Sequence, residues 1–157
     1  MLKEGDPAPA FDLPSDGGGR AGLKAVRGRW VVLYFYPKDD TEGCTIEARE
    51  FTALAAEFGH AGAIVIGISP DSPKSHDRFK AKHELDLLLA SDEEKTVAMA
   101  YGVWVEKSMY GRKFMGVERA TFLISPKGKI VRIWRKVSAR GHAEEVLAAL
   151  EAARTSA

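Results

Sequence analysis

The sequence has a single cysteine, Cys44, among its 157 residues, which excludes a disulfide within one chain and fits a reducing cytoplasm. It has no apolar run of membrane length, and its N-terminus lacks the hydrophobic core of a signal peptide. It also has almost no net charge, since 23 basic and 22 acidic residues leave a formal charge of +1. We therefore expect a cytoplasmic protein that binds neither nucleic acid nor membranes.

Metal and cofactor motifs are missing as well. The four histidines, His60, His76, His83 and His142, lack the spacing of a metal site and do not group with the cysteine, so we expect surface or capping roles for them. The run 17–19 of three glycines follows no strand pattern and precedes no Lys-Ser/Thr pair. This predicts a hairpin tip and not a phosphate-binding loop. The sequence implies no cofactor.

The order of the apolar patterns predicts the fold class. The length fits one domain, residues 1–157. Buried strands are expected at 30–36, 63–68 and 85–90, and a β-hairpin at 120–125 and 130–136. Helices are expected from Cys44 to Gly59, at 73–83 with Ser72 as cap, at 96–101 and from His142. A long loop is expected at 103–118, with or without a short strand in it. Such an order predicts an α/β protein, a thioredoxin-like sandwich with a central mixed β-sheet flanked by helices.

Cys44 lies just after the longest apolar run, Trp30 to Tyr36, which is bounded by Gly28 and Pro37 and predicts a strand buried on both faces. Cys44 then falls in the first turn of a helix at the carboxyl end of a central strand, where open α/β sheets place their sites. An ordinary thiol is only about 3% ionised at pH 7. The unpaired N–H groups of a helix start favour the thiolate, which is the nucleophilic form.

Three acidic residues, Asp39, Asp40 and Glu42, precede this cysteine. They suit a helix start, but as anions they oppose the ionisation of a neighbouring thiol. The sequence therefore predicts that a cation from elsewhere in the chain lies beside the sulfur.

The residues Pro37, Thr41 and Cys44 have the spacing P-x-x-x-T-x-x-C, and the segment FYPKDDTEGCTIEAREF resembles the peroxiredoxins, in particular the peroxiredoxin Q or bacterioferritin comigratory protein branch. The resemblance extends through residues 101–130, where Arg119 precedes a strand of the form TFLI. It implies a thioredoxin-like fold and a peroxidase in which Cys44 is the attacking thiolate. Arg119 falls on the family's arginine and supplies the missing cation.

The resemblance also implies roles for the neighbouring residues. Thr41 is expected to hydrogen-bond the peroxide and the sulfur, and its hydroxyl can cap the helix that starts beside it. Arg119 keeps its charge and can contact both a thiolate and a peroxide oxygen. Pro37 is expected to end the strand and to form an apolar wall over the sulfur. Glu47 is either a support for Arg119 or an ordinary acidic residue of a first helical turn.

Two departures from the family pattern change the expected chemistry. Glu42 stands where many members have proline, and its charge predicts lower reactivity. Arg49 and Lys80 stand where members carry a resolving cysteine, so the resemblance implies a one-cysteine enzyme. Cys44 would reduce hydrogen peroxide or an organic hydroperoxide and become a sulfenic acid, and an external thiol (thioredoxin, glutaredoxin or a small thiol) would recycle it. The resemblance favours a monomer or weak dimer.

A second interpretation is a redox sensor or chaperone-like protein with the same fold, in which oxidation of Cys44 is a signal. It predicts slow or stoichiometric consumption of peroxide. A disulfide oxidoreductase is excluded, because that activity needs a C-x-x-C pair and the chain has no second cysteine.

Overall fold

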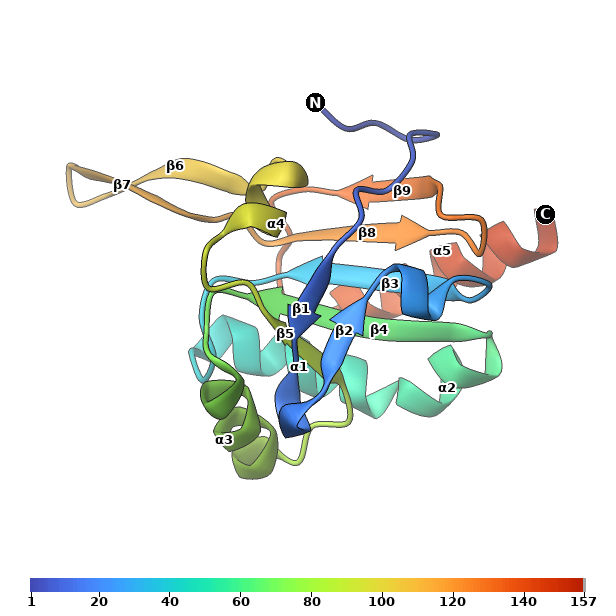
Figure 1. The fold of residues 1–157 in the computed structure, drawn as a ribbon, viewed down its shortest axis with the longest axis horizontal. Helices are drawn as coiled ribbons and strands as arrows, with labels where there is room; N and C mark the ends of the chain where they lie inside the picture. The colour runs from blue at the N-terminus through green and yellow to red at the C-terminus, as the bar shows by residue number, and fades with distance from the viewer. Residues whose placement is uncertain (157) are drawn as a thin grey trace.

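A five-stranded mixed sheet, in the order β5-β4-β3-β8-β9, forms the centre of the computed structural model, which describes residues 1–156 (Figure 1). β3, β4 and β5 run parallel, while β8 is antiparallel to both β3 and β9. Two smaller antiparallel sheets, β1–β2 and β6–β7, lie outside it. The predicted thioredoxin-like α/β class is confirmed.

The elements have the following bounds. The strands are β1 (Asp12–Pro14), β2 (Arg20–Gly22), β3 (Trp30–Phe35), β4 (Ala63–Ser69), β5 (Leu88–Ser91), β6 (Trp104–Met109), β7 (Arg112–Val117), β8 (Ala120–Ile124) and β9 (Ile130–Trp134). The helices are α1 (Glu42–Ala53), α2 (Ala55–His60), α3 (Pro73–His83), α4 (Thr96–Ala100) and α5 (His142–Ser156), with short 3₁₀ turns at η1 (Asp16–Gly18) and η2 (Lys24–Val26).

The central strand β3 divides the hydrophobic core into two clusters, because successive side chains of a strand point to opposite faces. Val32 and Tyr34 belong to the cluster that α1, α2, α3 and α5 cover, and Cys44 lies in that cluster. Leu33 and Phe35 belong to the cluster on the other face, beside α4 and the N-terminal segment. The apolar run read from the sequence is thus a strand buried on both faces, as predicted.

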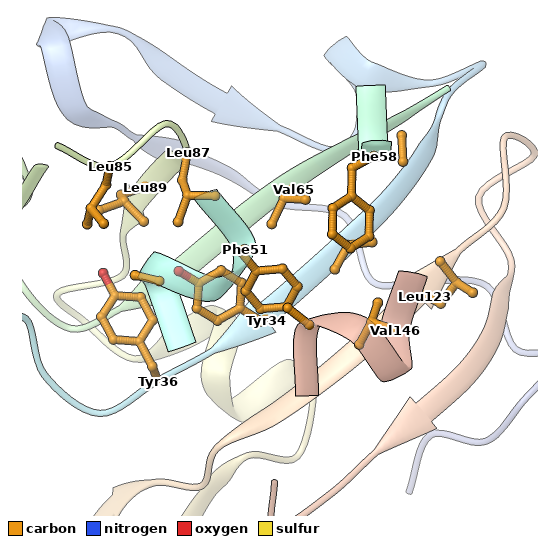
Figure 2. Close-up of a cluster of buried hydrophobic side chains, with 14 of the residues drawn as sticks. Tyr34, Tyr36, Phe51, Phe58, Val65, Leu85, Leu87, Leu89, Leu123 and Val146 are labelled. Carbon is orange, nitrogen blue, oxygen red and sulfur yellow. The ribbon is translucent and has the colours of Figure 1, made fainter. Parts of the chain in front are cut away.

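Aromatic rings fix α1 against the sheet (Figure 2). The ring of Tyr34 stacks on Phe51 of α1 at 4.8 Å between centroids, and both side chains are at most 1% exposed. Tyr34 lies directly over Gly67 of β4, where an added Cβ would come within 2.8 Å of the ring and hydroxyl. The glycine therefore creates the space that lets Tyr34 reach α1.

The helix that follows Cys44 differs from the prediction. One helix was expected to end at Gly59, but the chain leaves the helical conformation at Leu54 (φ −102°, ψ 11°), which separates α1 from α2. α2 then continues through Gly59, and the glycine with positive φ (75°) is Gly62. The apolar spacing continues across the break, so periodicity alone could not show it.

The prediction of a long loop at 103–118 is wrong, because β6 and β7 form a hairpin there. Its two-residue turn has Tyr110 at φ 52° and Gly111 at φ 77°, the left-handed pair that favours a tight hairpin. Charged side chains interrupt the alternation of apolar residues, which hid both strands. In Figure 1 the hairpin projects from the end of the sheet where β3 leads into α1.

Other expectations divide between confirmed and wrong. The run 17–19 lies at the tip of the β1–β2 hairpin, and Ser72 caps α3 by accepting a hydrogen bond from the Ser75 N–H at 3.1 Å, both as predicted. The surface or capping roles expected for the four histidines are wrong for His76 and His142, which are buried and contact the side chains of Asp39 and Thr121. Within residues 1–156, no helix has both the length and the apolar character needed to span a membrane. The same range contains no group of three or more His, Cys, Asp or Glu side chains placed to hold a metal ion.

Replacing Phe51 with alanine should lower the free energy of unfolding by about 3–5 kcal/mol, since it removes a fully buried ring between α1 and β3. Urea denaturation of wild type and variant measures the loss. Phe114→Ala is the matched control, because this ring is 44% exposed on the projecting hairpin and should change stability by about 0.5 kcal/mol or less. Equal losses in the two variants would contradict the assignment of the core.

Candidate active site

Cys44 lies in the first turn of α1, immediately beyond the carboxyl end of β3. The first bond of the helix runs from the Thr45 N–H to the Thr41 carbonyl, at 2.9 Å. The N–H groups of a first turn have no partner within the helix and carry partial positive charge. The Cys44 side chain is only 1% exposed, so the sulfur sits at the edge of the core with these N–H groups nearby.

Arg119 is the predicted cation, and the structure brings it to the sulfur. It immediately precedes β8, which pairs with β3. Its Nη2 donates a hydrogen bond to Cys44 Sγ at 3.3 Å, and its Nη1 donates to Glu47 Oε1 at 2.6 Å. One guanidinium thus joins the sulfur to a buried carboxylate one turn further along α1. Of the two interpretations left open for Glu47, the geometry matches a support for Arg119.

Gly43 makes room for this contact. A Cβ built on Gly43 would lie 3.1 Å from Nη2 of Arg119, closer than the great majority of side-chain contacts. Any larger residue would press against the guanidinium that bonds the sulfur. The sequence offered no signal for this role, because Gly43 reads there as an ordinary residue of a polar turn.

Burial dominates the electrostatics of Glu47. Its side chain is fully buried, and its Oε2 has no hydrogen-bond partner among residues 1–156. Burial raises the pKa of Glu47 to about 7, against the lowering influence of Arg119. Burial acts in the opposite sense on Arg119, but Glu47 and Cys44 outweigh it and raise the pKa of the guanidinium. Arg119 therefore stays charged.

Thr41 and Pro37 lie where the motif places them, with one correction. Thr41 is the residue before α1, but its hydroxyl does not cap the helix as predicted. The hydroxyl donates instead to the Lys38 carbonyl at 2.9 Å, which folds the turn back on itself. The Thr41 side chain is exposed, and its oxygen keeps lone pairs that can accept a hydrogen bond. Pro37 is half-buried and follows β3 after one residue.

The first of the three acidic residues, Asp39, is buried and paired with α3. Its carboxylate accepts hydrogen bonds from Tyr36 Oη at 2.6 Å and from Ser75 Oγ at 2.7 Å, and it lies 2.8 Å from Nδ1 of His76. Nε2 of His76 faces the Ala90 carbonyl at 3.0 Å. Both ring nitrogens of His76 therefore lie within hydrogen-bond distance of an oxygen atom.

Asp40 is paired with α3 as well. Its carboxylate lies 2.7 Å from Lys82 Nζ and 2.8 Å from His83 Nε2, and these partners lower the pKa of Asp40. Of the three acids expected to oppose ionisation of the thiol, only Glu42 has no ion pair among residues 1–156. Lys82 therefore offsets the charge of Asp40, so the negative charge beside Cys44 is smaller than the sequence suggested.

Comparison with known proteins agrees with this geometry. The model of the AhpC/TSA family matches residues 4–133. Peroxiredoxin Bcp of Xanthomonas campestris is 51% identical over 148 residues, which cover 93% of this chain and 92% of that protein. Peroxiredoxin Bcp of Bacillus subtilis is 44% identical and covers 96% of each chain.

Solved structures give the same result. A structure of the Xanthomonas campestris bacterioferritin comigratory protein, described in terms of its alkyl peroxide reduction activity, superposes with a TM-score of 0.88 at 49% identity over 92% of each chain. A peroxiredoxin Q structure from Xylella fastidiosa superposes with a TM-score of 0.92 at 42% identity over 97% of each chain.

The raised pKa of Glu47 predicts a dependence of stability on pH. The folded protein holds this proton more tightly than the unfolded chain, whose carboxyl has the ordinary pKa of 4.5. The resulting stabilisation is complete below pH 4.5 and is lost as the pH rises to about 7. The free energy of unfolding of wild type relative to Glu47→Gln should therefore fall by up to about 3 kcal/mol over this window. Denaturant titrations at several pH values measure this difference, and a constant difference would contradict it.

Proposed function

Because this chain belongs to the AhpC/TSA family and is a thiol peroxidase of the Bcp/peroxiredoxin Q kind, we propose that Cys44, Arg119, Thr41 and Pro37 form its peroxide site. The observation that carries the proposal is the 3.3 Å contact between the guanidinium of Arg119 and Cys44 Sγ. A cation in that position favours the thiolate, and only the thiolate attacks a peroxide rapidly.

Peroxide binding uses the groups around the sulfur. The Thr41 hydroxyl donates its hydrogen bond to the Lys38 carbonyl, so its free lone pairs accept a hydrogen bond from the O–H of the peroxide. This orients the hydroperoxide with its other oxygen toward the guanidinium of Arg119 and its O–H oxygen toward the sulfur. Pro37 has no N–H group, so it adds an apolar wall without competing for either oxygen.

The reaction then forms one bond and breaks one. The thiolate of Cys44 attacks the O–H oxygen of the hydroperoxide, the O–O bond breaks, and the sulfur becomes a sulfenic acid. The second oxygen leaves as an alkoxide or hydroxide, whose negative charge Arg119 stabilises. A proton from solvent converts the leaving group to an alcohol or water.

Recycling needs thiols from outside the chain, because Cys44 is the only cysteine. A first thiol attacks the sulfenic sulfur, releases water and leaves a mixed disulfide, and a second thiol frees Cys44 by exchange. Thioredoxin, glutaredoxin or a small thiol can fill this role, and a reducing compartment such as the cytoplasm supplies them. We expect the protein to act as a monomer or weak dimer without nucleic-acid or membrane partners.

Replacing Arg119 with methionine should slow the peroxide reaction at every pH, even where the thiol is fully ionised, since a group that binds peroxide and stabilises the leaving oxygen is lost. A decrease of about 100-fold or more is expected. Arg49→Met, on the exposed side of α1, is the control and should leave the rate unchanged. A wild-type rate in the Arg119 variant would remove Arg119 from the site.

Reduced protein that receives excess peroxide without thiol should consume about one equivalent quickly and then become inactive. The sulfenic acid has no partner thiol, and a further equivalent of peroxide oxidises it to the irreversible sulfinic form. A thiol donor present from the start should restore repeated turnover, with a mixed disulfide at Cys44 visible by intact-mass spectrometry. Cys44→Ser should consume none. Repeated turnover in the absence of any thiol would contradict the one-cysteine cycle, and stoichiometric consumption in the presence of many thiol donors would favour the sensor.

A further inference from the structure

His76 lies near the start of α3 and is completely buried, with 0% of its surface exposed. Its two ring nitrogens contact two separate parts of the chain. Nδ1 lies 2.8 Å from Oδ2 of Asp39 in the loop before α1, and Nε2 lies 3.0 Å from the carbonyl oxygen of Ala90 in β5. The ring therefore joins the loop at 37–41 to a strand of the central sheet.

The loop at 37–41 carries two residues of the proposed peroxide site, Pro37 and Thr41. In the part of the chain that the structure describes, none of the N–H groups of this loop donates to a backbone carbonyl. Asp40 has φ 60°, in the left-handed region that favours glycine, and other residues keep this conformation where the surrounding contacts hold it. The shape of the loop therefore depends on contacts made by side chains.

Asp39, in the middle of the loop, makes most of these contacts. Its side chain is only 4% exposed. The carboxylate accepts hydrogen bonds from Tyr36 Oη at 2.6 Å and from Ser75 Oγ at 2.7 Å, beside the contact with His76. The Asp39 N–H donates to Oδ2 of Asp71 at 2.8 Å, two residues beyond the end of β4. One loop residue is thus bonded to α3 and to the segments that follow β3 and β4.

His76 differs from the other partners of Asp39 in how firmly its own position is fixed. Tyr36 is only three residues from Asp39, so their bond shapes the loop locally. Ser75 reaches Asp39 with a single hydroxyl. The ring of His76 is held at both nitrogens, and it cannot turn away from Asp39 without also losing its contact with Ala90. His76 therefore fixes the loop relative to the sheet.

We propose that His76 is a positioning residue of the peroxide site, whose contact with Asp39 holds the loop so that the Thr41 hydroxyl meets the peroxide beside Cys44. This inference rests on the proposed function. Thr41 follows Asp39 by two residues and directly precedes α1, so a shift of Asp39 displaces the Thr41 hydroxyl relative to the sulfur. A displaced binding group orients the peroxide less well, and the reaction slows.

The test begins with His76→Leu, which keeps an apolar side chain in the space and removes both nitrogens. The rate at which the Cys44 sulfenic acid forms after a single addition of peroxide should fall about tenfold or more. The rate at which a thiol donor then reduces the sulfenic acid should stay at the wild-type value, because Thr41 orients the peroxide and not the thiol. His60→Leu, at the exposed end of α2, is the control and should change neither rate.

Two further variants separate positioning from a general loss of packing. Asparagine carries an N–H donor on Cγ, where histidine carries Nδ1, so His76→Asn can still bond Asp39 and should recover most of the wild-type rate. Thr41→Val alone should slow sulfenic acid formation. Adding His76→Leu to it should slow the reaction further by about twofold or less, because two residues that act through one contact are not additive.

Three results would overturn the inference: a wild-type rate of sulfenic acid formation in His76→Leu, no recovery in His76→Asn, or the full loss of His76→Leu repeated on top of Thr41→Val. Urea denaturation verifies that each variant is folded. If His76→Leu does not fold, His76→Gln takes its place, because its amide lies on Cδ, beyond the position that faces Asp39, and the same slowing is expected.

The same experiments distinguish this inference from the proposed function. Peroxide consumption by Cys44→Ser, or a wild-type rate in Thr41→Val, would contradict the proposed site and this inference with it. If both of these variants behave as expected and His76→Leu keeps the wild-type rate, only the role of His76 is wrong.

Discussion

The contacts of the Arg119 guanidinium are the interaction on which the rest of the site depends, because this one group bonds both the Cys44 sulfur and the Glu47 carboxyl of α1. Its contacts with Cys44 Sγ and Glu47 Oε1, at 3.3 Å and 2.6 Å, fix the sulfur, the helix start and the strand β8 relative to one another. A buried carboxylate such as Glu47 is costly unless it is paired, and a buried thiolate has the same requirement. Arg119 meets both requirements with a single planar group, and Gly43 leaves the space for it.

The helix α3 holds the loop at 38–41, which leads into α1. It provides His76, Lys82 and His83, which pair with Asp39 and Asp40. The loop can therefore carry two acidic residues just before the nucleophile, because each carboxylate has hydrogen-bond partners. Tyr36 adds a hydrogen bond from the end of β3 to Asp39, so the shape of the loop is set by both the central strand and α3.

The sequence was sufficient for the parts of the fold that depend on local patterns. The run at 30–36 predicted the strand β3, Ser72 predicted the start of α3, and the motif of Pro37, Thr41 and Cys44 predicted the position of the nucleophile. Elements were harder to predict where charged residues obscure the apolar pattern or where the contact joins residues far apart in the sequence. Charged residues hid the β6–β7 hairpin, and the helix break at Leu54 left no mark on the apolar spacing. The pairing of Asp39 with His76 joins residues 37 positions apart, so no local pattern reveals it.

The same limit applies to the site. Arg119 was expected in the site from the resemblance. Its contact with Glu47 could not be predicted, because it depends on how β8 meets α1. The spacing from Cys44 to Glu47 showed only that both lie on one side of a helix. The hydroxyl of Thr41 was misassigned as a cap because a turn carbonyl, that of Lys38, competes for it.

The central claim is that Cys44 reacts with peroxide with the help of its contact with Arg119 at the start of α1. The rate at which the Cys44 sulfenic acid forms after a single addition of peroxide, compared between wild type and Arg119→Met, measures that help directly. A decrease of about 100-fold or more in the variant is the expected result. An unchanged rate would show that the guanidinium contact does not assist the reaction, and it would contradict the account of the site.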